Sequence, residues 1–461
     1  MMTFAIFVGA GLFLLASFVL PCRIRLALAV PLSVFQLYLP GIMIGGYPPP
    51  MALLGALLLW PEFFIGLAFM LAWRPTQLIF SIGIAYVFSL VWSIDLQLGI
   101  RSLVYLWIFL AIFSAAVLEG RRNPSVIVNL LTWTVVLAAL QVVTIVVFRL
   151  MPIIKVGYLQ SPIARLFINK NVLDVLFTTM RNNVTDPLKS GGMLFTNANV
   201  AGAYMAVIAF TGIGLALVRK STRLFVASIL YMVAIFFTGS KAAIVLALLG
   251  SLMVLFLIAK NEPRLRRRLQ RWMFVIAALS VLSGCWWLVG SNSIGSSSAT
   301  AKTFAEESDA TLAIRQQIWS YAATAFSEHP LLGQGFGGWQ KGFAVYARFM
   351  GMPEGFPPHD TIIYLWSQGG LVAAMSGILF MLCLMIFARR QLGVHAGQPG
   401  FGLVLAPALA FAWVFTHGLG ENFGLLGDEH MTPILAALLA LAYIQRNPGA
   451  SKNLILSRGK L

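Results

Sequence analysis

Uncharged apolar stretches long enough to cross a membrane recur along most of this 461-residue chain. A helix needs about 20 consecutive apolar residues to span the hydrocarbon core of a bilayer. Hydrophobic residues make up 59% of the chain and charged residues only 10%. A soluble domain carries roughly 25% charged residues, far more than this chain has. The sequence therefore predicts an all-α fold, a polytopic bundle of membrane-spanning helices.

The apolar runs predict about 13 membrane helices, in a range of about 12–14 because some runs are short or contain proline. We expect them at roughly 4–20, 26–45, 51–73, 76–94, 102–119, 125–150, 195–218, 223–239, 241–259, 273–290, 361–388, 402–420 and 431–445. The first run lacks a basic segment before it, so we expect a retained helix and not a signal peptide. Five parts follow: N-terminal membrane helices (1–151), a first outer loop (152–193), central membrane helices (194–290), a large, partly helical outer loop (291–360), and C-terminal membrane helices with a cytoplasmic tail (361–461).

The net charge of +17 is distributed unevenly over this threading. One side of the membrane receives 20 of the 32 lysine and arginine residues, whereas the other receives 12 cations and 12 acids. Cytoplasmic loops of membrane proteins carry such an excess of Lys and Arg. The asymmetry therefore predicts that both long polar loops face outward, and it argues against nucleic acid as a partner.

The sequence gives little support for a metal site. The three cysteines, Cys22, Cys285 and Cys383, lie far apart in or beside apolar runs, without metal-binding spacing. The acidic cluster GDEH at 427–430 contains Asp428, which has no suitably spaced partner. We expect no metal and no other cofactor.

The outer location restricts the chemistry that the loops can carry out. Loops held by a rigid scaffold commonly carry functional sites. ATP and NAD are absent outside the cytoplasm, so a substrate activated for group transfer must arrive attached to a carrier. A lipid carrier in the bilayer is the natural vehicle.

The large outer loop contains a predicted helix, SDATLAIRQQIWSYAATAFSEHP, which Ser308 or Asp309 can cap and Pro330 ends. The serine-rich segment before it predicts a flexible linker. Arg315 and Trp319 are four residues apart and so share one face of the helix. They are either interfacial anchors or, for Arg315, a clamp whose planar fork matches phosphate oxygens.

The next segment, HPLLGQGFGGWQKGF, fits the pattern GxGxxG at Gly333, Gly335 and Gly338. A dinucleotide site needs a strand before that pattern, and here a helix precedes it. We therefore interpret the glycines as a turn that brings the backbone close to a ligand or a neighbouring helix.

The large loop ends at Pro357, Pro358, His359 and Asp360, directly before an apolar run. We expect His359 in the first turn of the next helix, where the helix dipole disfavours the imidazolium form. A neutral imidazole there can accept a proton from a sugar hydroxyl, although a plain polar helix start is the alternative. Asp360 either orients the ring or only caps the helix.

The first outer loop and the following helices offer further polar candidates. Asn197 and Asn199 begin a membrane helix, a position that suits capping or the binding of sugar hydroxyls. Arg181 and Lys189 lie just before it. Lys241 lies at the outer end of a hairpin between apolar runs, where a cation must pair or extend to the surface.

Four segments together resemble the membrane superfamily of O-antigen ligases and O-antigen (Wzy-type) polymerases. They read GMLFTNANVAG, TGSKAAI, IRQQIWSYAATAFSEHPLLGQGFGGW and PHDTIIYLWSQGGLVAA, within about residues 185–385. The resemblance implies an enzyme of the bacterial inner membrane, with a periplasmic active site, that uses an undecaprenyl-diphosphate-linked oligosaccharide donor. It implies that His359 is the base and that Arg315 and Lys241 contact the lipid diphosphate.

Two positions depart from the pattern of the superfamily. Lys241 stands where arginine is usual, which replaces a bidentate phosphate contact with a point charge. Asp360 stands where asparagine is usual, so an amide is missing there.

The leading interpretation is a polymerase of surface polysaccharide, O-antigen or exopolysaccharide, that transfers the glycan onto a lipid-linked repeat unit. A ligase that transfers it to lipid A-core, or a protein O-oligosaccharyltransferase, shares these motifs. A transporter or flippase would instead need ionisable residues paired within the spans. Glu62, next to Pro61, is the only ionisable residue that the sequence predicts near the middle of a membrane span.

Cysteine labelling of intact cells tests the predicted orientation. A cysteine at Ser297 should react with a membrane-impermeant reagent, whereas one at Leu265 should not, because only the former is placed outside. Reaction at Leu265 in sealed cells would reverse the orientation and remove the candidate site from the outer face.

Overall fold

The computed structural model of the protein describes residues 15–38, 50–176, 186–261, 297–352, 354–398, 400–421 and 424–446. These residues form helices joined by turns and contain no β-sheet. The predicted helix at 273–290, most of that at 4–20, Arg181 and Leu265 lie outside them. The described part of the chain confirms the predicted all-α, polytopic membrane fold.

The helices follow one another through mostly short connections. In order they are α2 (Cys22–Ala29), η1 (Pro31–Val34), α3 (Met51–Leu57), α4 (Trp60–Leu71), α5 (Arg74–Ser89), η2 (Leu90–Trp92), α6 (Leu96–Arg122), α7 (Pro124–Leu137), α8 (Ala139–Leu150), α9 (Pro152–Gln160), α10 (Ala164–Phe167), α11 (Lys170–Leu176), α13 (Ala198–Arg219), α14 (Thr222–Thr238), α15 (Lys241–Asn261), α17 (Ser297–Glu328), α18 (Gly338–Phe349), α19 (Thr361–Val394), α20 (Phe401–Gly418) and α21 (Thr432–Ile444).

Seven helices of the described residues are long and apolar enough to cross a membrane by length and composition. They are Arg74–Trp92, Leu96–Arg122, Pro124–Leu150, Ala198–Arg219, Lys241–Asn261, Thr361–Val394 and Phe401–Gly418. Three shorter apolar helices, α4, α14 and α21, also lie where spans were predicted. An apolar helix thus occupies ten of the predicted runs.

Two predicted helices are interrupted by proline. The predicted helix at 26–45 is wrong in its described part: α2 ends at Ala29 and a 3-10 helix begins at Pro31, whose missing N–H cannot continue an α-helix. The run at 51–73 is divided between α3 and α4, and Pro61 lies in the first turn of α4, where proline is tolerated.

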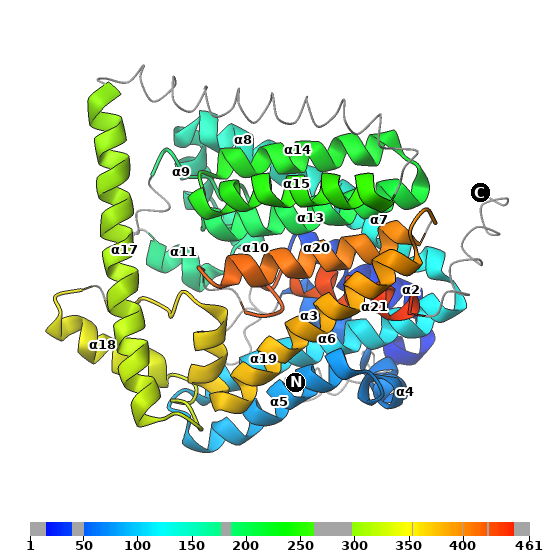
Figure 1. Ribbon diagram of the computed structural model, residues 1–461, viewed down its shortest axis with the longest axis horizontal. Helices are drawn as coiled ribbons and strands as arrows, with labels where there is room; N and C mark the ends of the chain where they lie inside the picture. Colours follow the sequence, from blue (N-terminus) through cyan, green and yellow to red (C-terminus); the bar gives the residue numbers. More distant parts are fainter. Residues whose placement is uncertain are drawn as a thin grey trace, which may run out of the picture.

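The centre of the bundle is α13, which is buried along nearly its whole length. It packs most extensively against α14 and α20, and Figure 1 shows α13, α14 and α15 lying side by side. A Cβ atom on Gly214 of α13 would lie 2.4 Å from the carbonyl oxygen of Gly402 in α20, so the two backbones touch there. Small residues allow such close contact between membrane helices.

One end of the bundle carries α17 and α18, and we call it the loop end. In Figure 1, α17 stands across the left-hand ends of α13–α15. It begins at Ser297, so the prediction of a flexible linker and of a start near Ser308 is wrong, whereas its end at Glu328, before Pro330, is as predicted. Tyr321 of α17 packs edge-on against Trp339 of α18, which attaches the two helices to each other.

A buried ion pair lies on the N-terminal side of the bundle. Glu62 of α4 accepts two hydrogen bonds from the guanidinium of Arg25 in α2, at 2.7 and 2.5 Å. Arg25 also donates to the carbonyl oxygens of Leu20 and Leu58. The acid that the sequence predicts within a span is therefore paired with a cation, and the ion pair ties α2 to α4.

Replacing Glu62 alone should destabilise the protein more than replacing both partners. Glu62→Ala leaves Arg25 buried without its counter-charge, which costs about 3–5 kcal/mol, whereas an apolar pair of similar volume is often tolerated. We expect a lower thermal unfolding temperature in detergent for Glu62→Ala than for the double variant Arg25→Met/Glu62→Met. Equal unfolding temperatures for Glu62→Ala and the wild type would contradict a stabilising role.

Candidate active site

A carboxylate, a guanidinium and an imidazole meet at the loop end. Arg315 Nη2, from α17, donates to Glu421 Oε1 at 3.0 Å. His359 Nδ1 lies 3.7 Å from Glu421 Oε2, within ion-pair distance when the imidazole is protonated. The side chain of Asn199, in the first turn of α13, hydrogen-bonds Glu421. We call these four residues the Glu421 cluster.

Glu421 is the buried centre of this cluster. It follows the end of α20 and is only 5% exposed. Burial by itself raises the pKa of the carboxyl, but the neighbouring His359, the charge of Arg315 and the hydrogen bond of Asn199 outweigh it. The pKa of Glu421 is therefore below its ordinary value, and the group is a carboxylate at neutral pH.

The backbone of His359 is in the left-handed region, with a φ of 50°. A residue other than glycine adopts this conformation only at a cost of about 1–3 kcal/mol, and such strain concentrates at functional sites. The expectation that His359 lies in the first turn of the helix is wrong. Asp360 is the N-cap, because its Oδ1 accepts from the amides of Ile362 and Ile363 at 2.7 and 2.9 Å.

The capping carboxylate of Asp360 is itself partly desolvated. Burial raises its pKa, and the two hydrogen bonds from the backbone amides oppose that shift. Of the two roles considered for Asp360, the geometry supports the cap, which sets the position at which the backbone leaves His359 and enters α19.

The glycine-rich turn after α17 packs against α19. Gly333, Gly335 and Gly337 all have positive φ, between 66° and 81°. A Cβ on Gly333 would lie 2.1 Å from the carbonyl oxygen of Trp366, so only glycine fits beside α19 there. α19 has a non-helical residue at Gly370, where Leu371 N donates to Leu331 O at 2.9 Å. The turn thus contacts a neighbouring helix, as one of the two interpretations held.

The remaining candidates lie around the cluster rather than in it. Asn197 is the N-cap of α13, since its Oδ1 accepts from Asn199 N at 2.8 Å. Lys241 is the first residue of α15 and its side chain is exposed. Lys189 Nζ lies 3.8 Å from Asp186 Oδ2. Trp319 is 39% exposed on α17.

Sequence reasoning did not identify Glu421. It lies in the segment HGLGEN directly after an apolar run, where an acid has the appearance of an ordinary helix end. Its partner Arg315 is 106 residues earlier in the chain. The only available signal was an acid that follows a buried helix within a few residues.

The cluster is suited to accepting a proton next to an anion. Glu421 lies within ion-pair distance of His359 Nδ1, where a carboxylate favours the positive charge that an imidazole gains on protonation. A guanidinium has five N–H donors, so Arg315 can bind Glu421 and an anionic group at the same time. Among the described residues, no group of three or more His, Cys, Asp or Glu side chains is arranged to hold a metal ion.

A model of the family described as O-antigen ligase matches residues 224–376. The matched region runs from α14 into α19 and contains Lys241, Arg315, His359 and Asp360, whereas Asn199 and Glu421 lie outside it. A comparison with curated proteins found no match. The match confirms the superfamily that the sequence motifs resemble.

Proposed function

We propose that the chain, whose residues 224–376 match the family model described as O-antigen ligase, polymerises a surface polysaccharide. In this proposal it transfers a glycan from undecaprenyl diphosphate onto a lipid-linked repeat unit, on the periplasmic side and without a metal. The supporting observation is the Glu421 cluster, which joins a strained histidine and a partly exposed arginine through one buried carboxylate.

The proposed reaction needs one base and one cationic site. His359 takes the proton of the acceptor hydroxyl, and the oxygen attacks the anomeric carbon opposite the diphosphate. As the new C–O bond forms, the bond to the diphosphate breaks, and the diphosphate leaves with the electron pair. Arg315 and Lys241 stabilise its negative charge, and the anomeric configuration inverts.

Glu421 acts on this reaction through His359 and Arg315. Its lowered pKa means that it stays ionised over the whole pH range in which histidine titrates. It therefore stabilises the imidazolium that forms during transfer, and it orients the arginine. Glu421 is a positioning residue in this proposal, because no reacting atom has to touch it.

A ligase that transfers the glycan to lipid A-core is the second candidate. The matched family model carries the description O-antigen ligase and covers residues that both reactions would use. Both reactions use the same donor and the same base, so they differ only in the acceptor. Purified protein supplied with the lipid-linked donor, with or without lipid A-core, distinguishes them: chain extension on the lipid carrier supports the polymerase, and glycan on lipid A-core supports the ligase.

His359→Ala should slow transfer by about 10²–10⁴-fold, the usual contribution of general-base catalysis, while folding and donor binding persist. The wild-type rate should rise with pH through the histidine range, because the neutral imidazole is the competent form and Glu421 does not titrate there. Turnover of a defined lipid-linked donor, with EDTA present, is the measurement.

Asp360→Asn is the matched control for this experiment. Asparagine caps helices as well as aspartate does, so activity should persist. Near-normal turnover by His359→Ala would show that His359 is only a polar residue at the start of the helix and not a base. Loss of wild-type activity in EDTA would contradict the metal-independent mechanism.

Arg315→Lys should lose most activity although the charge is kept, because an ammonium lacks the planar fork that holds Glu421 and a phosphate together. Lys241→Arg should be tolerated, since the resemblance places arginine there. Initial rates at saturating donor, at matched protein levels in membranes, give the comparison. A fully active Arg315→Ala variant would show that the arginine is only an interfacial anchor.

A further inference from the structure

A cavity of about 430 Å³ lies between α5, α6, α13 and α19 and is also lined by the segment 424–430. Ligand sites for small molecules typically have volumes of about 300–1,000 Å³, so a sugar residue or two fits this space. None of the predicted catalytic residues lines it. Aromatic side chains form much of its wall, namely Tyr38, Tyr86, Tyr105, Phe167, Phe195 and Tyr364.

Two buried polar side chains of the wall have atoms without hydrogen-bond partners in the described part of the chain. Gln368 is 4% exposed, and its Oε1 has no partner. His430 is 4% exposed, and its Nε2 has none. Its Nδ1 lies 3.4 Å from Asp428 Oδ2, and its ring packs against that of Phe195 at a tilt of 55°, with 4.4 Å between ring centroids. A buried polar atom without a partner is unfavourable, and rotation of either side chain into the cavity would let a polar ligand supply the missing hydrogen bond.

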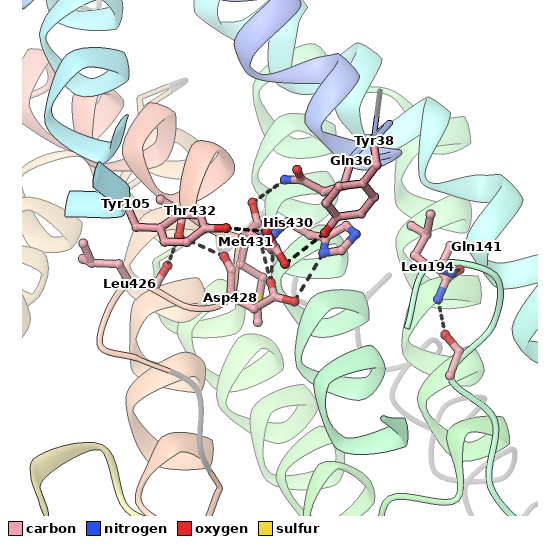
Figure 2. Close-up of polar contacts among 12 residues, drawn as sticks. Gln36, Tyr38, Tyr105, Gln141, Leu194, Leu426, Asp428, His430, Met431 and Thr432 are labelled. Carbon is pink, nitrogen blue, oxygen red and sulfur yellow. Dashed lines mark hydrogen bonds and ion pairs between the residues drawn. The ribbon is translucent and has the colours of Figure 1, made fainter. Parts of the chain in front are cut away.

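The segment that carries His430 is fixed by a second set of contacts. The hydroxyl of Tyr38 donates to Glu429 Oε1 at 3.0 Å, and the hydroxyl of Tyr105 donates to Glu429 Oε2. Figure 2 shows the two tyrosines beside Asp428 and His430. Gln36 Nε2 donates to the backbone carbonyl of Glu429 at 2.5 Å. Asp428 Oδ1 accepts from His430 N and Met431 N at 3.1 and 3.0 Å. The wall around His430 is therefore formed before any ligand binds.

The charges of the wall select the class of ligand. Asp428 and Glu429 are acidic and Arg101 is basic, so the wall has no excess of cations for a diphosphate. An acyl chain would leave Gln368 and His430 without partners. A neutral sugar satisfies both requirements, because its hydroxyls bond to amide and imidazole groups and its C–H faces pack on aromatic rings.

The cavity and the Glu421 cluster share the first turns of two helices. Asn197 lines the cavity, and Asn199, two residues later in α13, hydrogen-bonds Glu421. Tyr364 lines the cavity, and its amide donates at 2.9 Å to the carbonyl of Asp360, the residue after His359. Tyr364 is five residues after His359, so the cavity begins about one to two helical turns from the proposed base.

We infer that this cavity binds the terminal sugar of the glycan acceptor. The inference rests on the proposed function, which requires an acceptor hydroxyl beside His359. The donor sugar must remain joined to the diphosphate near Arg315 and Lys241, neither of which lines the cavity. Gln368 and His430 thus determine which acceptor binds, and the cluster determines how fast it reacts.

The test uses Gln368→Leu and His430→Phe in the full-length protein in lipid nanodiscs. Gln391→Leu is the matched control, because its Oε1 is also buried without a partner in the described residues, near the other end of α19 and away from the cavity. One probe is the lipid-free oligosaccharide released from the native donor by mild acid, and the other is undecaprenyl diphosphate. Binding is measured by calorimetry, and KM for donor and acceptor by turnover.

Each cavity variant should weaken oligosaccharide binding and raise the acceptor KM by about tenfold, the effect of one lost hydrogen bond, with undecaprenyl diphosphate binding unchanged. Unchanged oligosaccharide binding in both variants would overturn the inference, and so would a raised KM for the donor alone. If oligosaccharide binds in the cavity but the wild type transfers no glycan, the proposed function fails instead.

A second measurement tests the inference if Gln368→Leu or His430→Phe does not fold. Ser102 lines the cavity, so Ser102→Cys in a cysteine-free background should react with a small thiol reagent. The oligosaccharide should slow that reaction, whereas undecaprenyl diphosphate should not. Labelling at an unchanged rate in saturating oligosaccharide would show that the sugar binds elsewhere.

Discussion

The buried carboxylate of Glu421 is the interaction on which the candidate site depends. A buried charge is costly unless it is paired and hydrogen-bonded. Here the pairing requires Arg315 from α17, His359 from the start of α19 and Asn199 from the start of α13 to converge at the end of α20. One desolvated group thus couples the position of the large loop to the ends of three membrane helices.

The surrounding backbone holds the histidine where this pairing needs it. His359 has a strained left-handed conformation, and Asp360 caps α19 immediately after it. Trp339 Nε1 donates to the carbonyl of Phe356 at 3.1 Å, which attaches the segment before His359 to α18. On the far side of the first turns of α19, the glycine turn docks at Gly370. The strain at His359 persists because packing on both sides leaves no relaxed alternative.

The sequence was sufficient to predict what depends on local composition. Charge-free apolar runs predicted most of the described helices. The family resemblance implied that Arg315 and His359 belong to one site, and the structure places both beside Glu421. Proline effects inside apolar runs were underestimated, so the continuous helix at 26–45 was wrong. The start of α17 was missed because polar serine-rich composition favours a linker locally, whereas the structure forms a helix from Ser297. The role of Glu421 could not be predicted from the sequence, because it depends on contacts between segments that are far apart in the chain.

In the proposed function, charge is separated between two neighbouring regions, one for the charged lipid and one for the neutral sugar. The Glu421 cluster has an arginine whose donors exceed what one carboxylate uses. The cavity has amide, phenol and imidazole groups in a wall without excess cations. If the cavity and the Glu421 cluster were one site, Arg315 would attract the diphosphate into the space for the sugar. The carboxylates of Asp428 and Glu429 would at the same time repel the diphosphate from Arg315. In the proposed mechanism, the two regions lie on successive turns of α13 and α19, so the diphosphate and the acceptor bind independently and both reach His359.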